Sequence, residues 1–492
     1  MVAERRPQNR HGSRLAERPR TCTMKKHLTI VIKLGTSSIV DEKSHEPLLS
    51  ILSTIVETAC KLQKDGHRVV IVSSGAIGVA LGHMEMERRP KHLPQVQALA
   101  AIGQCKLMSL WDQLFMHRRQ PIAQILLTRN DIADRTQYLN AQNTFIELIH
   151  MGVIPIVNEN DTLSVAEIKF GDNDTLSAIT AAMVQADYLF LMTDVDCLYD
   201  SNPRSNPNAK AIEVVEDIGD LVADVSSAGS SVGTGGMATK ITAARLATSA
   251  GVTTIITRSD KPGNIANIVA YAESKKAEEL AAKRSSRQGS TDGSESLSNS
   301  TSNLTLEEPS LVKKAVVNEV SSTNGTVSPK LDTPSLPPLH TRFIPDLHPI
   351  RDRYFWLLYG LAPHGTVYID KGAHRALADK AGLLPAGVVE VEGNFAQQEA
   401  VRIVVVQRKS KGSFEYEKED PAPFEVGRAL VNYSAAEIKR IRGLKSTEIH
   451  AALGYADSEY IALRENIAFG NRTSRPATPS RMSMSQELES RH

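Results

Sequence analysis

Apolar residues between positions 27 and 270 follow two alternating patterns. Short apolar runs, beginning with LTIVIKL at 28–34 and RVVIV at 68–72, have the composition of strands that are buried on both faces. Between such runs the apolar residues fall at helical spacing. The first of these helical stretches contains Leu48, Leu52, Ile55, Val56, Ala59 and Leu62.

The same alternation continues through the rest of this region. Further strands are predicted at 121–127, 153–157, 187–192 and 252–257. Helices are predicted at about 47–65, 94–118, 135–150, 172–185 and 237–250. Strands that alternate with long helices pair in parallel through right-handed crossovers. We therefore predict a three-layer α/β/α sandwich with a mainly parallel central sheet.

A change in composition near residue 284 divides the chain. The run at 285–303 is rich in serine and poor in apolar residues, and prolines crowd the region around 329–345. Order is expected again from 354–360. The β-like pieces TVYID at 366–370, VVEVEG at 388–393 and AVRIVVVQ at 400–407 predict a small β-barrel-like domain. The predicted division is a disordered extension at 1–26, a first domain at 27–282, a disordered linker at 283–345, a second domain at 346–470 and a disordered tail at 471–492.

The bulk composition narrows the function classes. Hydrophobic residues make up 41% and charged residues 23%, as in an ordinary globular protein, and the net charge of +1 gives no reason to expect nucleic acid or a membrane as partner. No stretch approaches the ~20 apolar residues of a membrane-spanning helix. Four cysteines without a CxxC pair argue against a disulfide scaffold or a zinc site and favour a reducing compartment, which predicts a cytoplasmic protein.

The first 26 residues raise the alternative of mitochondrial targeting. They are rich in arginine and poor in acidic residues, as transit peptides are. Pro7 and Pro19 interrupt any amphipathic helix, and Met24 offers an alternative start directly before the first strand. A disordered extension is the favoured interpretation.

Four segments follow predicted strands, where parallel α/β sheets bind their ligands. In KLGTSS at 33–38, Lys33 ends a buried strand and Gly35 lets the backbone approach an anion. Taken alone, Lys33 reads more simply as a strand-end lysine that reaches water. In VSSGAIGVA at 72–80, free backbone N–H groups could face an anionic ligand, although a tight strand-to-helix turn explains this segment equally well.

The third segment, at 157–178, is the densest in polar residues. Two clusters of acidic and amide side chains flank a β-like run, and they comprise Asn158, Glu159, Asn160, Asp161, Asp172, Asn173 and Asp174. A solvated loop would explain each cluster separately, because Asn and Asp favour turns and helix N-caps. It explains less well why the two clusters flank a β-like run that leads back into a helix, which favours a binding site.

The fourth segment, VGTGGMATK at 232–240, leads into an apolar helix with Lys240 one turn inside it. Glycine-rich turns into helix N-termini bind phosphate through exposed N–H donors and the helix dipole. A flexible glycine-rich loop is the alternative. The P-loop spacing and the protein-kinase HRD and DFG motifs are absent from the sequence, so the pattern indicates a phosphate site of another kind.

Taken together and in order, these segments resemble the amino-acid kinase superfamily and, within it, the glutamate 5-kinase family. The matching strings are VIKLGTSS, VSSGAIGVALG, VQALAAIGQCKL, QILLTRNDI, IPIVNENDT, EIKFGDNDTLSA, LMTDVDCLY and VGTGGMATK. The second domain, with KAGLLPAGV at 380–388 and ALGYADSEYIALREN at 452–466, resembles the PUA domain attached to many members of that family.

The resemblance implies a role for each matching residue. Lys33 and Lys240 would contact the transferring phosphoryl group, and Asp174 would accept hydrogen bonds from both. Glutamate would be bound by Ser74, Asp161 and Asn173, with Asp161 as a partner for the α-ammonium group. The ATP site would comprise Lys33, Gly35, Thr193, Asp194, Thr234, Gly235, Gly236, Met237, Ala238, Thr239 and Lys240.

The implied reaction is ATP-dependent phosphorylation of the γ-carboxylate of L-glutamate, the first step of proline synthesis. This carboxylate is ionised near neutral pH, since free glutamate titrates near ~4.3, so direct in-line transfer needs neither a general base nor a covalent intermediate. One anion must approach another, and charge neutralisation by the two lysines and by ATP-bound Mg²⁺ would supply catalysis. No protein ligand for a metal is predicted.

The resemblance also implies binding partners, and it leaves alternative functions to consider. Expected partners are proline as a feedback inhibitor, a second copy of the chain, and a glutamyl-5-phosphate reductase. RNA binding through the PUA-like domain is put in doubt by the charged insertion at 408–425. An N-acetylglutamate kinase or an aspartokinase is the nearest alternative enzyme. The alternative from another class is an RNA-binding or regulatory protein without kinase activity, which the presence of both lysines disfavours.

Overall fold

The computed structural model describes residues 27–163, 173–221, 236–288 and 336–470, except positions 204, 351, 411–413 and 420. The predicted extension at 1–26, the predicted tail and most of the predicted linker lie outside the described residues.

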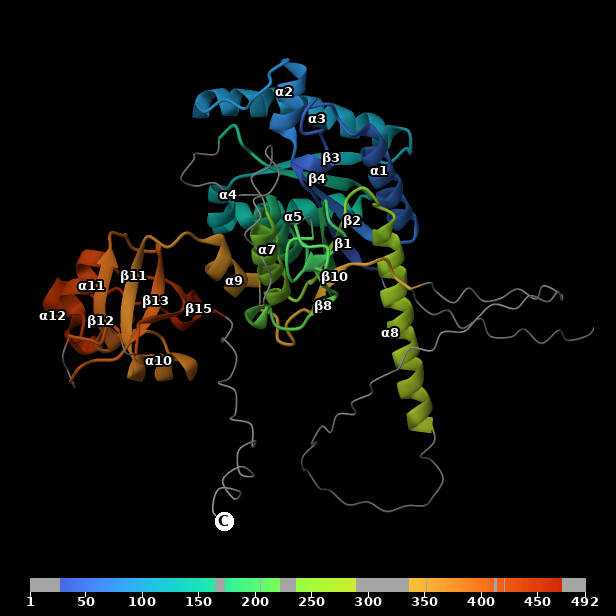
Figure 1. Ribbon diagram of the computed structural model, residues 1–492. Coiled ribbons are helices and arrows are strands. Elements are labelled where there is room, and N and C mark those ends of the chain that lie inside the picture. The colour runs from blue at the N-terminus through green and yellow to red at the C-terminus, as the bar shows by residue number, and fades with distance from the viewer. Residues whose placement is uncertain are drawn as a thin grey trace, which may run out of the picture.

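An eight-stranded sheet forms the centre of the first domain (Figure 1). Its strands are β1 (Thr29–Leu34), β2 (Arg68–Ser73), β3 (Ile122–Leu127), β4 (Ile154–Glu159), β5 (Tyr188–Thr193), β8 (Val214–Val215), β9 (Thr253–Arg258) and β10 (Thr341–Phe343). They lie in the order β3-β4-β2-β1-β5-β9-β10-β8, and the first six are parallel. The short strands β6 (Leu198–Tyr199) and β7 (Ala211–Ile212) pair separately.

Helices cover both faces of this sheet (Figure 1). They are α1 (Leu49–Lys64), α2 (Ala76–His83), α3 (Leu93–Met116), α4 (Arg129–Ala133), α5 (Arg135–His150), α6 (Asn173–Met183), α7 (Met237–Ser249) and α8 (Asn264–Gln288). One face of the sheet packs on α1, α3 and α8, and the other packs on α5, α6 and α7. The predicted three-layer α/β/α sandwich with a mainly parallel sheet is confirmed.

The alternation of side chains along β1 decides where Lys33 points. Ile30, Ile32 and Leu34 belong to the core that contains α1 and α3, whereas Val31 belongs to the core that contains α6 and α7. Successive residues of a strand face opposite sides of the sheet. Lys33 therefore shares a face with Val31 and lies toward α6 and α7.

The predicted linker at 283–345 is wrong at both ends. Helix α8 continues to Gln288, and β10 pairs antiparallel with β9 inside the sheet of the first domain. In β10, Thr341 Oγ1 accepts a hydrogen bond from Leu198 N–H at 2.7 Å, and the Phe343 side chain is fully buried. A three-residue strand between prolines has no recognisable pattern of its own, because its hydrogen-bond partners lie far away in the sequence.

The second domain has its own sheet and core. Its strands are β11 (Gly365–Asp370), β12 (Val388–Gly393), β13 (Ala400–Val406), β14 (Phe424–Leu430) and β15 (Ile467–Phe469). They form a mixed sheet in the order β12-β11-β13-β14-β15. Its helices are α10 (Lys371–Ala378), α11 (Ala435–Ile441) and α12 (Ile449–Leu453). The first three strands coincide with the β-like pieces predicted from the sequence.

A short connector anchors the second domain to the first. It consists of α9 (Asp352–Phe355) and a π-helix (Trp356–Gly360), and it lies between the two sheets (Figure 1). The Trp356 indole N–H donates to the Ile132 carbonyl at 2.9 Å. The Asp352 carboxylate accepts hydrogen bonds from Tyr138 at 2.8 Å and from Arg135 at 3.2 Å. The connector is therefore fixed to α4 by a buried hydrogen bond and to α5 by half-buried polar contacts.

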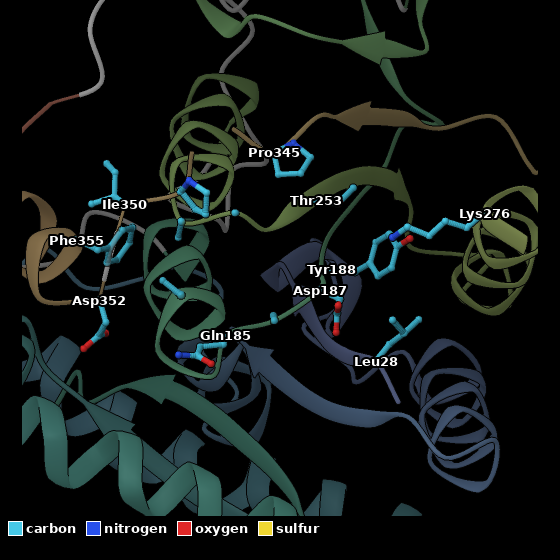
Figure 2. A pocket seen from close by; sticks show the side chains of 15 residues that line it. Leu28, Gln185, Asp187, Tyr188, Thr253, Lys276, Pro345, Ile350, Asp352 and Phe355 are labelled. Carbon is cyan, nitrogen blue, oxygen red and sulfur yellow. The ribbon is translucent and has the colours of Figure 1, made fainter. Parts of the chain in front are cut away.

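A pocket of about 510 Å³ lies beside this connector, and Asp352 and Phe355 form part of its lining (Figure 2). Leu28, Tyr188 and Thr253 line it at the amino ends of β1, β5 and β9, and Pro345 and Phe355 line its other side. Parallel α/β sheets bind their substrates at the opposite, carboxyl edge. The pocket is thus separate from the four chemistry-bearing segments.

Helices α2 and α3 pack unusually closely beside the carboxyl ends of the strands. A Cβ atom on Gly103 of α3 would lie 1.7 Å from the Ala76 carbonyl oxygen and 3.0 Å from the Ala80 Cβ. Only glycine fits here, and the close approach brings α3 toward the ends of β2 and β4.

Replacing Gly103 by alanine should therefore force α2 and α3 apart. We expect Gly103→Ala to lower the free energy of unfolding by about 1–3 kcal/mol, the usual cost of overpacking. Gly263→Ala is the control, because nothing lies within 4 Å of its Cβ position and its backbone conformation is ordinary. Urea unfolding of both variants tests this, and equal stabilities would contradict the close packing.

Candidate active site

A buried carboxylate lies between two buried lysines at the carboxyl edge of the sheet. Asp174, in the first turn of α6, is fully buried, and Lys33 from β1 and Lys240 from α7 are 3% and 7% exposed. Lys33 Nζ forms an ion pair with Asp174 Oδ1, and Lys240 Nζ lies 3.3 Å from Asp174 Oδ2. The Thr239 hydroxyl donates to the same Oδ2 atom at 2.7 Å.

The electrostatics of this cluster favour an ionised Asp174. Burial alone would raise the pKa of the carboxyl group, but the charges of Lys33 and Lys240 outweigh it and lower the pKa of Asp174 from 3.8 to about 2. Two ammonium groups and one carboxylate leave the trio with a net charge of +1. A fixed positive charge in a buried setting suits an anionic ligand such as a phosphoryl group.

The amino end of α7 adds to this positive field. Gly236 caps the helix, its N–H donates to Thr239 Oγ1 at 3.1 Å, and Lys240 follows one residue later. The first N–H groups of a helix lack intrahelical partners and carry the positive end of the dipole. The described part of the glycine-rich segment therefore brings the first turn of α7 to Asp174, where Lys240 and Thr239 contact the carboxylate.

A network of amide groups adjoins the lysine cluster. Asn173, which precedes Asp174 at the start of α6, donates from Nδ2 to Ser74 Oγ at 2.9 Å and to Asn158 Oδ1 at 3.1 Å. The Ser74 backbone N–H bonds to the Leu34 carbonyl at 3.0 Å, which ties the end of β2 to that of β1. Two of the three predicted glutamate-binding residues thus touch each other beside the predicted catalytic groups.

The remaining predicted residues have the following places. Thr193 ends β5, next to β1, and donates to the Asp194 carboxylate at 3.1 Å. Gly35 follows β1, and its Cβ position is 3.9 Å from Lys33 Nζ. Asp161 follows β4, and its N–H donates to the Glu159 carbonyl at 2.9 Å. Gly236, Met237 and Ala238 begin α7, whereas Thr234 and Gly235 lie outside the described residues.

Two contributions were not predicted from the sequence. Thr239 was assigned only to the nucleotide site, yet it hydrogen-bonds Asp174. Gln104 of α3 accepts a hydrogen bond from Asn158 Nδ2 at 2.9 Å and so joins the amide network. A single glutamine on a long amphipathic helix is ordinary, and no spacing in the sequence relates Gln104 to a segment that lies more than 50 residues away.

Comparison with known proteins identifies the family to which the chain belongs. The model of the amino acid kinase family matches residues 28–258, and that of the PUA domain matches residues 365–453. A Schizosaccharomyces pombe protein named "Probable glutamate 5-kinase" is 49% identical over 450 residues, which cover 91% of this chain and 94% of that protein. The glutamate 5-kinase of a Cyanothece species is 41% identical over 441 residues, with 89% and 98% covered.

Among solved structures, an isopentenyl phosphate kinase of T. acidophilum is similar to 49% of this chain and 95% of its own, with 14% identity and a TM-score of 0.36. That likeness adds no argument of its own. By the family match and the curated relatives, the chain is an amino acid kinase with an attached PUA domain. Within this class it belongs to the glutamate 5-kinase family, as the motifs predicted.

Each helix of the described residues is too short or too polar to cross a membrane.

The Asp174 carboxylate should make stability depend on pH. A group whose pKa falls from 3.8 to about 2 on folding contributes stability that is complete above pH 3.8 and is lost as pH falls toward 2. We expect wild-type protein to lose on the order of 2 kcal/mol more unfolding free energy than Asp174→Asn over this range. Near pH 7 the variant should be less stable by about 3–5 kcal/mol, since it leaves two buried ammonium groups unpaired.

Urea unfolding of both proteins at several pH values between 7 and 2 measures this difference. Parallel pH profiles for wild type and Asp174→Asn would show that the carboxylate is not held in its ionised form by the lysines.

Proposed function

We propose that this protein transfers the γ-phosphoryl group of ATP to the γ-carboxylate of L-glutamate and so forms L-glutamyl 5-phosphate. The observation that carries the proposal is the buried Lys33–Asp174–Lys240 cluster, which concentrates positive charge at the carboxyl edge of a parallel sheet. The relatives named glutamate 5-kinase supply the substrate assignment.

In the proposed reaction the lysines act as charge stabilisers. The attacking carboxylate is already ionised, so the barrier lies in bringing it to an anionic phosphate and in stabilising charge on the transferring group. Lys33 and Lys240, which contact different oxygens of Asp174, donate hydrogen bonds to the oxygens of the transferring phosphoryl group. Because Asp174 and Thr239 fix their ammonium groups in advance, little reorganisation is needed when charge develops. The phosphoryl group passes directly between substrates, without a covalent enzyme intermediate.

The glutamate site in this proposal lies over the amide network. Ser74 and Asn173 are connected by a hydrogen bond of 2.9 Å, and Asp161 follows the neighbouring strand β4. A carboxylate at Asp161 suits the α-ammonium group of the substrate.

The nucleotide site lies along the ends of β1 and β5 and the start of α7. It comprises Lys33, Gly35, Thr193, Asp194, Thr234, Gly235, Gly236, Met237, Ala238, Thr239 and Lys240. Support comes from the helix N-terminus at Gly236 and from the position of Thr193 at the end of a strand adjacent to β1.

Mg²⁺ is proposed as a companion of ATP. The described residues contain no group of three or more His, Cys, Asp and Glu side chains that could hold a metal ion. The carboxylate of Asp174, in the proposed transfer site, forms ion pairs with two lysines. This donor set fits an ion that is held chiefly by ATP phosphates and water rather than by a protein cage. When bound, the ion supplies charge neutralisation at the phosphates.

The wider setting follows from the product. An acyl phosphate is labile in water, so we propose that a glutamyl-5-phosphate reductase consumes it in proline synthesis and that proline inhibits the kinase. A homo-oligomeric state and a cytoplasmic location complete the proposal. RNA binding through the PUA domain remains an expectation.

An ATP-consumption assay with competing acceptors tests the function directly. L-Glutamate should be phosphorylated in preference to L-aspartate and N-acetylglutamate, and added proline should slow the reaction. Activity confined to aspartate or N-acetylglutamate would overturn the substrate assignment, and ATP consumption without any acceptor dependence would overturn the activity.

Removal of one lysine should affect catalysis far more than folding. We expect Lys240→Ala to lower kcat at least ~10²-fold, the usual effect of removing one preorganised electrostatic contact. Lys275→Ala is the control, because that lysine is exposed on α8, outside the proposed site, and forms an ion pair with Glu278, which is also exposed. Steady-state kinetics and thermal unfolding of both variants decide the matter, and near-native turnover in Lys240→Ala would reject its catalytic role.

Asp161 should act on one substrate only. We expect Asp161→Ala to raise KM for glutamate by at least ~10-fold, the effect of losing a charge-assisted hydrogen bond, and to leave KM for ATP nearly unchanged. Initial-rate kinetics with each substrate varied in turn provide the measurement. A larger rise in KM for ATP would place Asp161 in the nucleotide site instead.

A further inference from the structure

The amide of Asn173 leaves one buried hydrogen-bond acceptor to be satisfied. Its Nδ2 atom donates to both Ser74 Oγ and Asn158 Oδ1, at 2.9 and 3.1 Å. Its Oδ1 atom is buried and has no hydrogen-bond partner among the described residues. A buried acceptor without a donor is unfavourable, and this one lies one residue from Asp174 beside the proposed transfer site.

The orientation of the Asn173 amide is set indirectly by the backbone N–H of Glu159, which is connected to it through the side chain of Asn158. Asn158 is 2% exposed, and its Oδ1 atom accepts the backbone N–H of Glu159 at 2.9 Å. A main-chain N–H is always a donor, so this end of the Asn158 amide is the oxygen. The same oxygen also accepts one of the two Nδ2 hydrogens of Asn173, which turns Asn173 Oδ1 away from Asn158.

Gln104 completes this network from helix α3. Its Oε1 atom accepts one of the two Nδ2 hydrogens of Asn158, with an N–O distance of 2.9 Å. The residue reaches β4 because its neighbour Gly103 allows α3 to approach α2 closely. A chain of hydrogen bonds therefore connects Gln104 through Asn158 to Asn173, and we call this chain the relay.

The chemistry of the substrate identifies the donor that Asn173 Oδ1 requires. Both carboxylates of L-glutamate accept hydrogen bonds and donate none near neutral pH, whereas its α-ammonium group has three N–H donors. Within this substrate, the α-ammonium group alone can satisfy the buried oxygen.

We propose that Gln104 is a positioning residue for substrate recognition, which acts through Asn158 to hold the Asn173 carboxamide oxygen toward the α-ammonium group of the acidic amino acid. This inference rests on the proposed function. It adds a determinant of the preference for an amino acid over a simple dicarboxylate, supplied by helix α3, which contributes none of the three residues Lys33, Asp174 and Lys240.

Gln104→Met and Gln104→Glu form a matched pair for the test. Methionine keeps the length of the side chain and removes the acceptor, whereas glutamate keeps an acceptor oxygen at the same place. In the methionine variant we expect KM for L-glutamate to rise about 5- to 10-fold, the effect of losing one buried hydrogen bond, with KM for ATP unchanged. The Gln104→Glu variant should recover most of this loss.

Glutarate is glutamate without the amino group. Its binding distinguishes a loss of Asn173 positioning from a general disruption of the substrate site. Its inhibition constant against glutamate should be the same in wild type and Gln104→Met, because it has no ammonium group for Asn173 to contact. An equal weakening of glutamate and glutarate, or an unchanged KM for glutamate in Gln104→Met, would overturn the relay.

Measurements on the wild-type protein distinguish a failure of this inference from a failure of the proposed function. If wild type neither phosphorylates L-glutamate nor binds it in a calorimetric titration, the function is wrong and the relay falls with it. If wild type is active but the two Gln104 variants behave alike toward glutamate, the function stands and the relay alone is rejected.

Discussion

Two lysine ammonium groups lie buried at the carboxyl edge of the sheet, and the carboxylate of Asp174 makes this possible. Burial of one ammonium group is costly, and burial of two close together is prohibitive without a compensating charge. Asp174 contacts Lys33 through one oxygen and Lys240 through the other, and Thr239 hydrogen-bonds the second oxygen. The arrangement leaves a net positive charge with fixed geometry, which is what the transfer of a phosphoryl group between two anions requires.

The fold brings these groups together through simple geometry. Parallel strands end at one edge of the sheet, and the alternation of side chains along β1 directs Lys33 to the face covered by α6 and α7. Asp174 and Lys240 lie in the first turns of those two helices. The amide network beside them depends on α3, whose approach to α2 is set by Gly103. Residues remote from the chemistry thus determine the orientation of groups that would contact the substrate.

Most of the first domain could be predicted because its signals are local. Each buried strand and each amphipathic helix has its own periodicity, so β1, α5 and α7 begin within a residue or two of the expected positions. The pairing of Lys33 with Asp174 and Lys240 came from family resemblance, since a strand-end lysine read alone is unremarkable. Strand β10 and the partner of Asn158 escaped prediction because their identity depends on contacts across long sequence separations.

The central claim is that Lys33 and Lys240 flank the transferring phosphoryl group while Asp174 holds them in place. A crystal structure of the protein with ADP, glutamate and an aluminium fluoride mimic of that group tests it most directly. The account predicts that both Nζ atoms lie about 3 Å from fluoride ligands and that Asp174 still contacts both lysines. A structure in which either lysine points away from the mimic, or in which Asp174 has left the pair, would contradict it.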